Sequence, residues 1–180
     1  TIHDMVFWNQ NSKFKKNIWY WDKIFCIYHA LKISDQVITV SESSKDSIIK
    51  QYPWSEKKLN VIYHGLSEQF LNLKILLDKE QYFMFIGGRN FYKNYDLLLD
   101  AFSEFIKRYP NWKLHVVGQN EQSLDVEKKR YKELGIDNHV IDHGLIDDES
   151  LTNLLLNASA LVIPSLNEGF NFPLLSLIHI

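Results

Sequence analysis

The sequence predicts an α/β protein with parallel sheets, and three observations support this fold class. Short apolar runs alternate with longer amphipathic stretches along the 180 residues, as expected for strand–helix–strand units. Several of the apolar runs end in a glycine, as at Gly87 and Gly118. The apolar fraction of 46% and the charged fraction of 23% are typical of a chain that buries a core. Wholesale disorder is therefore excluded.

The expected elements follow from this pattern in chain order. Apolar, β-branched and aromatic runs predict buried strands over residues 36–40, 59–63, 82–86, 113–117, 140–141 and 160–163. Amphipathic stretches predict helices over residues 42–52, 95–108 and 148–157. Ser41 is the expected N-cap of the first of these helices, and Pro53 ends it. Residues 67–80 lack a strand pattern, so we expect a linker between two lobes there.

Composition excludes several classes of function. The net charge of −2 does not favour nucleic acid as a partner. Cys26 is the only cysteine, which excludes an internal disulfide and fits a reducing compartment. No apolar run approaches the roughly 20 residues that span a bilayer. We expect a cytoplasmic protein, with peripheral association at the inner membrane face as a further option.

The first candidate site is a glycine-rich loop with two cations, over residues 87–94. Gly88 follows a predicted buried strand and lets the backbone approach an anion, while Arg89 and Lys93 place positive charge beside it. Arginine offers a planar fork to phosphate oxygens, and lysine offers a mobile point charge. The loop matches neither the dinucleotide nor the P-loop spacing. It predicts a diphosphate site, and the alternative is a solvated loop with two ordinary surface cations.

The second candidate site follows the last predicted strand, over residues 164–173. Pro173 suits the first turn of a helix, so the backbone amides of Gly169, Phe170 and Asn171 would point toward an anion. A carboxylate at Glu168 would be costly beside a phosphate unless it binds hydroxyls, and sugar hydroxyls are its natural partners. The alternative is a glutamate in an exposed turn.

These two elements, in this order, resemble the donor lobe of the family 4 glycosyltransferases. Further stretches that resemble this family are TIHD at 1–4, VITVS at 37–41, VIYHG at 61–65 and the run at 157–165. The family consists of retaining, nucleotide-sugar-dependent enzymes of the GT-B fold, with two Rossmann-like lobes. The resemblance implies a fragment in which both lobes are incomplete. Residues 1–72 would hold the end of the acceptor lobe and the hinge, and residues 73–180 a truncated donor lobe.

The resemblance also implies roles for individual residues. Arg89 and Lys93 would bind the donor diphosphate and stabilise the leaving group, and Glu168 would hold donor-sugar hydroxyls. His3 would face the reacting sugar, with a satisfied strand-end histidine as the alternative. The other expected donor-binding residues are Gly88, Gly118, Gly144, Leu145, Gly169, Phe170 and Asn171.

Cations at the diphosphate remove the need for a metal in the expected reaction. The leaving group would be stabilised by arginine and lysine, and no D-x-D triplet is present. Asp147, Asp148 and Glu149 instead fit the acidic start of a helix. We therefore expect no metal and no cofactor beyond a GDP- or UDP-linked sugar as co-substrate.

The expected function is retaining transfer of a hexose to a surface-glycan or lipid-linked acceptor. Tyr92 before Lys93 is similar to mannosyltransferase-like members of the family, which favours GDP-mannose. A second hypothesis is a catalytically inactive fragment that only binds a nucleotide-sugar. A third is a GT-B-fold sugar-nucleotide epimerase, against which the segment EGFNFP argues.

Two segments depart from the simple pattern. Ser176 stands where the second glutamate of the family's E-x7-E motif should fall. The last six residues, LSLIHI, match a translation of a transposase sequencing adapter, so we expect residues from about 175 to 180 to be non-native. The alternative is a genuine serine at position 176 and a genuine apolar tail. Near the other end, residues 13–21 mix lysines with aromatics. This mixture predicts either contact with an anionic membrane or, as the favoured alternative, a helix with core aromatics and solvated lysines.

Overall fold

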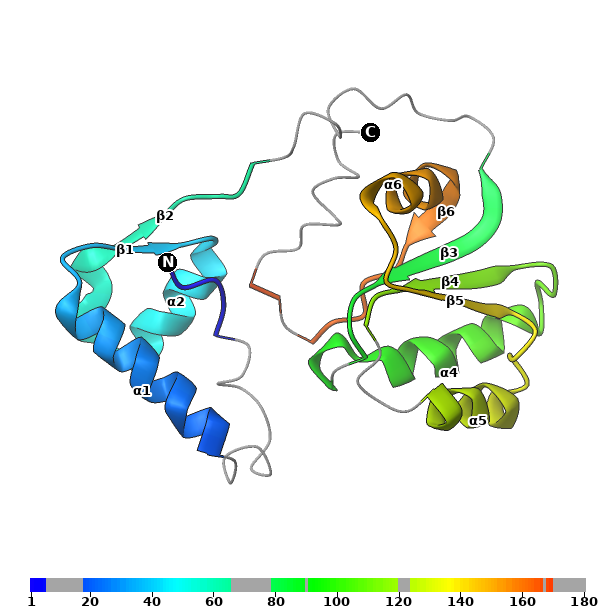
Figure 1. Ribbon diagram of the computed structural model, residues 1–180, viewed down its shortest axis with the longest axis horizontal. Coiled ribbons are helices and arrows are strands. Elements are labelled where there is room, and N and C mark those ends of the chain that lie inside the picture. The colour runs from blue at the N-terminus through cyan, green and yellow to red at the C-terminus, as the bar shows by residue number, and fades with distance from the viewer. Residues whose placement is uncertain (6–17, 66–78, 90, 120–123, 167, 170–180) are drawn as a thin grey trace. The chain divides into compact units, whose positions relative to one another are not determined.

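The computed structural model describes residues 1–5, 18–65, 79–89, 91–119, 124–166 and 168–169 (Figure 1). The chain divides into two compact units, whose described parts are residues 1–65 and 79–166, with residues 168–169 grouped with the first. Some of the predicted features fall outside the described residues: most of the linker predicted over 67–80, the lobe boundary at 72–73, residues 13–17, Phe170, Asn171, Ser176 and the tail over 175–180. The last residue of the predicted linker, Glu80, instead begins a strand.

The first unit combines two helices with a small parallel sheet. Its elements are α1 (Ile18–Ile33), β1 (Val37–Thr39), α2 (Glu42–Gln51), the short 3₁₀ helix η3 (Pro53–Lys58) and β2 (Leu59–Val61). Strands β1 and β2 pair in parallel, with Val37 opposite Leu59. Ile2 forms an isolated parallel bridge to Thr39 of β1.

Local sequence explains how these elements begin and end. The Ser41 hydroxyl accepts a hydrogen bond from the Ser44 amide at 3.1 Å, which confirms Ser41 as the N-cap of α2. Lys58 Nζ donates to the carbonyl oxygens of Leu31 at 3.1 Å and Ser34 at 2.8 Å, which satisfies acceptors at the end of α1. The unit buries a cluster of apolar side chains: Ile2, Met5, Leu31, Val37, Ile48 and Leu59.

The second unit is a four-stranded parallel sheet in the order β5-β4-β3-β6. Its strands are β3 (Glu80–Ile86), β4 (Lys113–Val117), β5 (Val140–Gly144) and β6 (Ala158–Leu161). Its helices are the 3₁₀ helix η4 (Phe91–Lys93), α4 (Tyr95–Ile106), α5 (Leu124–Leu134) and α6 (Asp148–Asn157). In Figure 1, α4 and α5 lie on one side of this sheet and α6 on the other.

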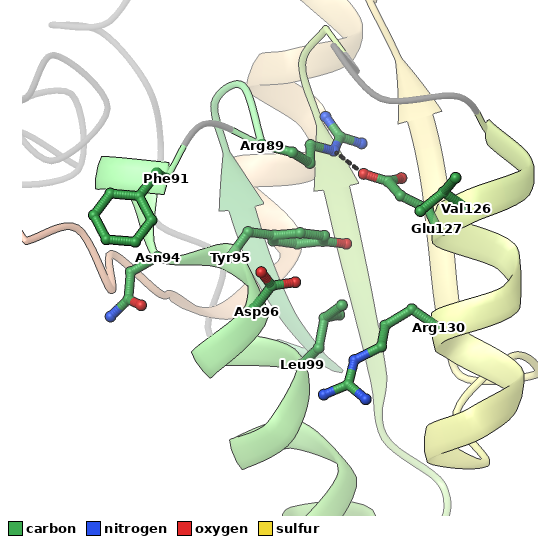
Figure 2. A pocket seen from close by; sticks show the side chains of 9 residues that line it. All are labelled: Arg89, Phe91, Asn94, Tyr95, Asp96, Leu99, Val126, Glu127 and Arg130. Carbon is green, nitrogen blue, oxygen red and sulfur yellow. Dashed lines mark ion pairs between the residues drawn. The ribbon is translucent and has the colours of Figure 1, made fainter. Parts of the chain in front are cut away.

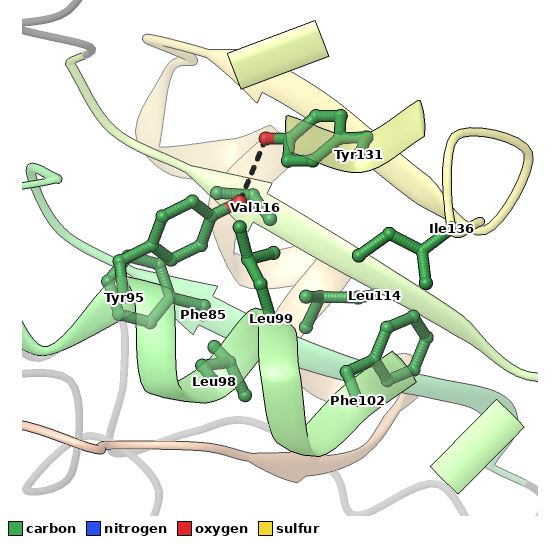
Figure 3. Packing of buried hydrophobic residues seen from close by; sticks show 9 residues of the cluster. All are labelled: Phe85, Tyr95, Leu98, Leu99, Phe102, Leu114, Val116, Tyr131 and Ile136. Carbon is green, nitrogen blue, oxygen red and sulfur yellow. Dashed lines mark hydrogen bonds between the residues drawn. The ribbon is translucent and has the colours of Figure 1, made fainter. Parts of the chain in front are cut away.

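The two faces of the sheet carry separate cores because side chains alternate along each strand. On the face of α4 and α5, Phe85 packs among the side chains that Figure 3 shows, and Leu114 and Val116 are fully buried. On the face of α6, Met84 packs with Leu155. A sheet that is apolar on both faces must be covered on both, which explains the three-layer arrangement.

Most of the expected elements are confirmed, with differences that have physical causes. Helix α5 is missing from the predicted elements, because its sequence LDVEKKRYKEL is mostly charged and shows little apolar periodicity. Strand β5 extends three residues beyond the expected 140–141, since its polar end pairs with β4. Strand β6 begins at Ala158 and ends at Leu161, two residues earlier than expected at each end.

Helix α1 begins within the aromatic segment over residues 13–21. Tyr20 is buried, whereas Trp21 is 59% exposed and Phe25 is 64% exposed. The described helix therefore contains a buried aromatic residue, as the core-helix interpretation predicts, and exposed ones as well. Contact with a membrane stays a prediction. Among the described residues, no helix combines the length and the apolar character needed to cross a membrane.

Candidate functional site

Three neighbouring strands of the second unit end in glycines at one edge of the sheet. Gly87 follows β3, Gly118 follows β4, and Gly144 ends β5. Backbone hydrogen bonds continue past the strands, from the Gly87 amide to the Val117 oxygen at 2.9 Å and from the Gly118 amide to the Gly144 oxygen at 2.8 Å. Ligands of open parallel sheets bind at this carboxyl edge. Gly118 and Gly144 therefore share one edge with the loop that begins at Gly87, as the sequence predicts.

Gly118 sits where no other residue fits. Its φ of +129° is a conformation that side chains rarely allow. A Cβ at this position would lie 2.5 Å from the carbonyl oxygen of Gly87. The backbones after β3 and β4 therefore approach each other closely. The three atoms nearest to such a Cβ all belong to the main chain of Gly87.

The loop after β3 carries the lysine over this edge. A Cβ placed on Gly87 would lie 3.4 Å from Lys93 Cε and 3.8 Å from Lys93 Nζ, so the lysine side chain passes directly over the end of β3. Lys93 Nζ also lies 5.5 Å from the centre of the Tyr92 ring. The ammonium group is thus held beside main chain at the carboxyl edge, where the sequence predicts a cation.

Asn94 connects this loop to the end of β6. It adopts the left-handed conformation, with φ of 55°, and forms the N-cap of α4. Its Nδ2 donates to the carbonyl oxygen of Pro164 at 3.2 Å, and the Leu166 amide donates to the Tyr92 oxygen at 2.8 Å. Residues 164–166 therefore lie against the β3–α4 loop, which brings the end of the first predicted site segment, 87–94, next to the start of the second, 164–173.

Arg89 lies inside the protein, with its side chain only 1% exposed. Its Nη1 donates to the Gly118 oxygen at 2.6 Å and to the Gly87 oxygen at 3.3 Å. Its Nη2 donates to Asp142 Oδ2 at 2.8 Å, and its Nε lies 3.3 Å from Glu127 Oε1. Figure 2 shows this side chain reaching toward Glu127 on α5. Its expected role toward a diphosphate stays a prediction, and the described contacts are all within the protein.

Two tyrosines extend this buried network. The Tyr131 hydroxyl donates to Glu127 Oε2 at 3.2 Å and lies 2.9 Å from the Tyr95 hydroxyl. Burial raises the pKa of the Glu127 carboxyl, and the Arg89 guanidinium opposes that shift. Burial also raises the pKa of both tyrosines, which keeps them protonated and able to donate. Glu127 and Tyr131 are absent from the predicted site residues, because both come from α5, a helix that shows little apolar periodicity.

A pocket of about 330 Å³ opens between α4 and α5 beside this network (Figure 2). Residues on its wall include Arg89, Phe91, Tyr95, Leu99, Glu127 and Arg130. Arg130 pairs with Asp100 at 2.5 Å and so joins the two helices on the exposed side. The two arginines of the pocket, Arg89 and Arg130, are therefore already paired with carboxylates.

The remaining predicted site residues lie in different places. Leu145 is 77% exposed just after β5, and Gly88 is half-buried in the loop after β3. His3 is exposed, with its ring stacked on His64 at 5.6 Å between centres. Gly169 belongs to the same unit as His3, and a Cβ on it would lie 2.7 Å from the His3 oxygen. Glu168 is half-buried beside it.

The structure thus gathers part of the predicted site within the second unit. Arg89, Lys93, Gly118 and Gly144 share the carboxyl edge of its sheet. His3, Glu168 and Gly169 group with the first unit. Within the described residues, no group of three or more His, Cys, Asp or Glu side chains is placed to hold a metal ion.

His115 on β4 should make the stability of the second unit depend on pH. Burial, with the neighbouring His143, lowers the pKa of His115 from 6.5 to about 4. In the unfolded chain, His115 therefore binds a proton below about pH 6.5. In the folded chain it binds that proton only below about pH 4. We expect the free energy of unfolding to fall by roughly 1–2 kcal/mol as pH drops through this window. Denaturant titrations at several pH values would measure it.

A matched pair of variants isolates this effect. The His115 ring stacks on Tyr82 at 4.0 Å between centres, so His115→Phe keeps an aromatic ring there and removes the titrating group. This variant should lose most of the decline between pH 6.5 and 4. The same substitution at His29, which is exposed on α1, should keep it. An unchanged decline in His115→Phe would show that other groups cause the pH dependence.

Comparisons with known proteins agree with this geometry. The chain is 27% identical over 179 residues to the O-antigen chain mannosyltransferase RfbU of Salmonella typhimurium, covering 96% of this chain and 47% of that protein. It is 30% identical over 153 residues to the mannosylfructose-phosphate synthase of Agrobacterium fabrum, covering 76% of this chain and 34% of that protein. The chain spans less than half the length of both of these curated relatives.

Structural similarity extends to solved glycosyltransferases. A mutant of TarM from S. aureus, solved with UDP and α-GlcNAc-glycerol among its ligands, superposes with a TM-score of 0.74 at 17% identity. The match covers 88% of this chain and 31% of that one. The α/β fold with parallel sheets is thus part of a GT-B fold. The family model for glycosyl transferases group 1 matches residues 68–176, well over half of the chain, and the chain therefore belongs to that family.

Proposed function

We propose that the carboxyl edge of the β5-β4-β3-β6 sheet binds the diphosphate of a nucleotide-sugar, and that the whole protein transfers the sugar to a glycan or lipid-linked acceptor. The observation that carries this proposal is the position of Lys93 over Gly87, beside the close approach of Gly118. A cation next to main chain at the carboxyl end of a strand is a favourable place for phosphate oxygens. Family membership supports the same class of reaction.

The site would act through the charge that develops when the anomeric bond breaks. The leaving nucleoside diphosphate gains negative charge as the sugar becomes oxocarbenium-like. Lys93 and backbone amides near the start of α4 are positioned before the reaction, so they stabilise this charge without reorganising. In the retaining course that we propose, the acceptor attacks on the leaving-group side, and a departing phosphate oxygen takes its proton. The positive charge in this proposal comes from the protein alone.

The other residues of the proposal belong to the sugar end of the donor. Glu168 would accept hydrogen bonds from sugar hydroxyls, with Gly169, Phe170 and Asn171 supplying backbone amides. Contact between Gly169 and His3 within the first unit supports a shared role for these segments near the reacting sugar. Leu145 is exposed after β5 and would pack against the base.

Mannose is the donor sugar that we propose first, carried by GDP. Support comes from two curated relatives, one named as a mannosyltransferase and the other as a mannosylfructose-phosphate synthase. UDP is the alternative, because a structure with a similar fold was solved with UDP. A chain that binds a nucleotide-sugar without turnover is the second candidate function.

Calorimetry with GDP and with UDP tests the proposal, followed by an assay of GDP-mannose and UDP-sugar hydrolysis. We expect saturable binding of one diphosphate, with the corresponding nucleoside bound more weakly because it offers no phosphate oxygens to the site. Hydrolysis of the matching sugar donor would support transfer, whereas binding without hydrolysis would support the binding-only alternative. Absence of binding for both diphosphates would overturn the proposed site.

A further inference from the structure

Two histidines of the first unit follow segments that lie on the two sides of β1. Thr39 of β1 pairs in parallel with Ile2 on one side and with Val61 of β2 on the other. His3 directly follows Ile2, and His64 lies three residues after Val61. Because both segments run parallel to β1, the two histidines lie at the same carboxyl edge of this small sheet. Ligands of open parallel sheets bind at such an edge.

The two imidazole rings stack across the end of β1. Their centres lie 5.6 Å apart and their planes differ by 10°, which is within the range of offset-stacked rings. Adjacent strands are about 4.8 Å apart, so segments on the two sides of β1 are separated by roughly 9–10 Å. The side chains of His3 and His64 must therefore lean toward each other over the strand end to make this contact.

His3 has a fixed backbone, and its side chain is open to solvent. The Ser44 hydroxyl, in the first turn of α2, donates to the His3 oxygen at 3.1 Å. His3 is exposed, and His64, on which its ring stacks, is half-buried. An exposed imidazole on a fixed backbone has about three χ1 wells and two ring orientations to choose from. The stack favours one of these arrangements.

We propose that His64 is a positioning residue, which holds the His3 imidazole in one orientation so that it meets the donor sugar. This inference rests on the proposed function, because it concerns the histidine that would lie near the reacting sugar. A ring that is oriented before the substrate arrives removes the entropy cost of ordering it at that moment. In this proposal His64 acts through the face of its ring, and His3 makes the contact with the sugar.

Three substitutions at His64 separate stacking from a direct polar contact. His64→Phe keeps a flat ring and loses both ring nitrogens, whereas His64→Asn keeps a polar group and loses the ring. We expect His64→Ala and His64→Asn each to lower kcat/KM by between about 3-fold and 10-fold, since a free His3 ring has the productive orientation about one-sixth of the time. His64→Phe should stay within about twofold of the unaltered protein. Turnover of GDP-mannose and of UDP-glucose by the whole protein would measure these effects.

A double variant shows whether His64 acts through His3. His3→Gln combined with His64→Ala should lose no more turnover than His3→Gln alone, because the ring that His64 orients is then already absent. Affinity for GDP and UDP should stay within about twofold in every variant, since the proposed diphosphate site lies in the second unit. The matched control is His29→Ala, which removes another stacked ring, 5.9 Å from Phe25 on α1, and should leave turnover unchanged.

The outcomes distinguish this inference from the function on which it rests. Unchanged turnover in His64→Ala, additive losses in the double variant, or a loss in His64→Phe as large as that in His64→Ala would overturn the inference and leave the proposed function intact. Absence of donor turnover by the unaltered protein would instead refute the proposed transfer, and the inference with it.

Discussion

Replacing Gly118 with alanine is expected to destabilise the second unit by roughly 2–5 kcal/mol and to abolish diphosphate binding. The new Cβ would lie 2.5 Å from the oxygen and 2.8 Å from the carbon of the Gly87 carbonyl group. The three nearest atoms all belong to the backbone of Gly87, so no flexible side chain can move aside. The φ of +129° adds strain that only glycine avoids. Denaturant unfolding and calorimetry would measure both effects.

Gly135→Ala is the matched control for this steric argument. Gly135 directly follows α5 with a φ of +68°, but a Cβ there meets nothing within 4 Å. Its substitution should therefore cost about 1–2 kcal/mol from backbone strain alone and leave diphosphate affinity unchanged. The difference between the two variants measures the close approach of the strand ends. Equal losses in stability and unchanged binding in both would show that this approach does not shape the site.

Sequence patterns predicted most of the sheet, because buried strands and helices carry apolar residues at regular spacing along the sequence. Strand β3 and helix α4 both bury side chains at regular spacing, and both lie where the pattern indicated. Helix α5 was not predicted, because it buries the charged Glu127 and the hydroxyl end of Tyr131 and has no apolar stripe. Its stability comes from partners that are distant along the chain, which no local window contains.

For the candidate site, the sequence predicted the position of the loop but not the direction of its side chains. A glycine-rich loop after a buried strand indicated the edge where a ligand would bind, and the structure gathers Gly87, Gly118 and Lys93 there. The direction of the Arg89 side chain was beyond local sequence, because it depends on Asp142, 53 residues further along the chain. Two cations that look equivalent in one loop therefore occupy very different surroundings, one buried among carboxylates and one over main chain.

Lys93 is the cation whose loss should affect the proposed site most directly. Lys93→Ala is expected to weaken diphosphate binding by between about 10-fold and 150-fold, because a hydrogen bond to a charged group contributes ~1.5–3 kcal/mol. Transfer by the whole protein should fall further, by up to ~3–4 kcal/mol of transition-state stabilisation, as charge on the leaving group grows. Calorimetry of the chain and donor turnover by the whole protein would measure the two effects.

Lys107→Ala is the control that separates a local effect from the loss of one positive charge. Lys107 follows α4 in the same unit and pairs with Glu104 on the exposed surface, at 2.6 Å. Its removal changes net charge identically and should leave affinity within about twofold, since exposed pairs contribute little. Stability should change little in either variant, because the Lys93 side chain crosses the end of β3 without entering a core cluster. Equal affinity losses in both variants would mean that Lys93 acts only through overall charge, and the diphosphate would then have to bind elsewhere on the sheet edge.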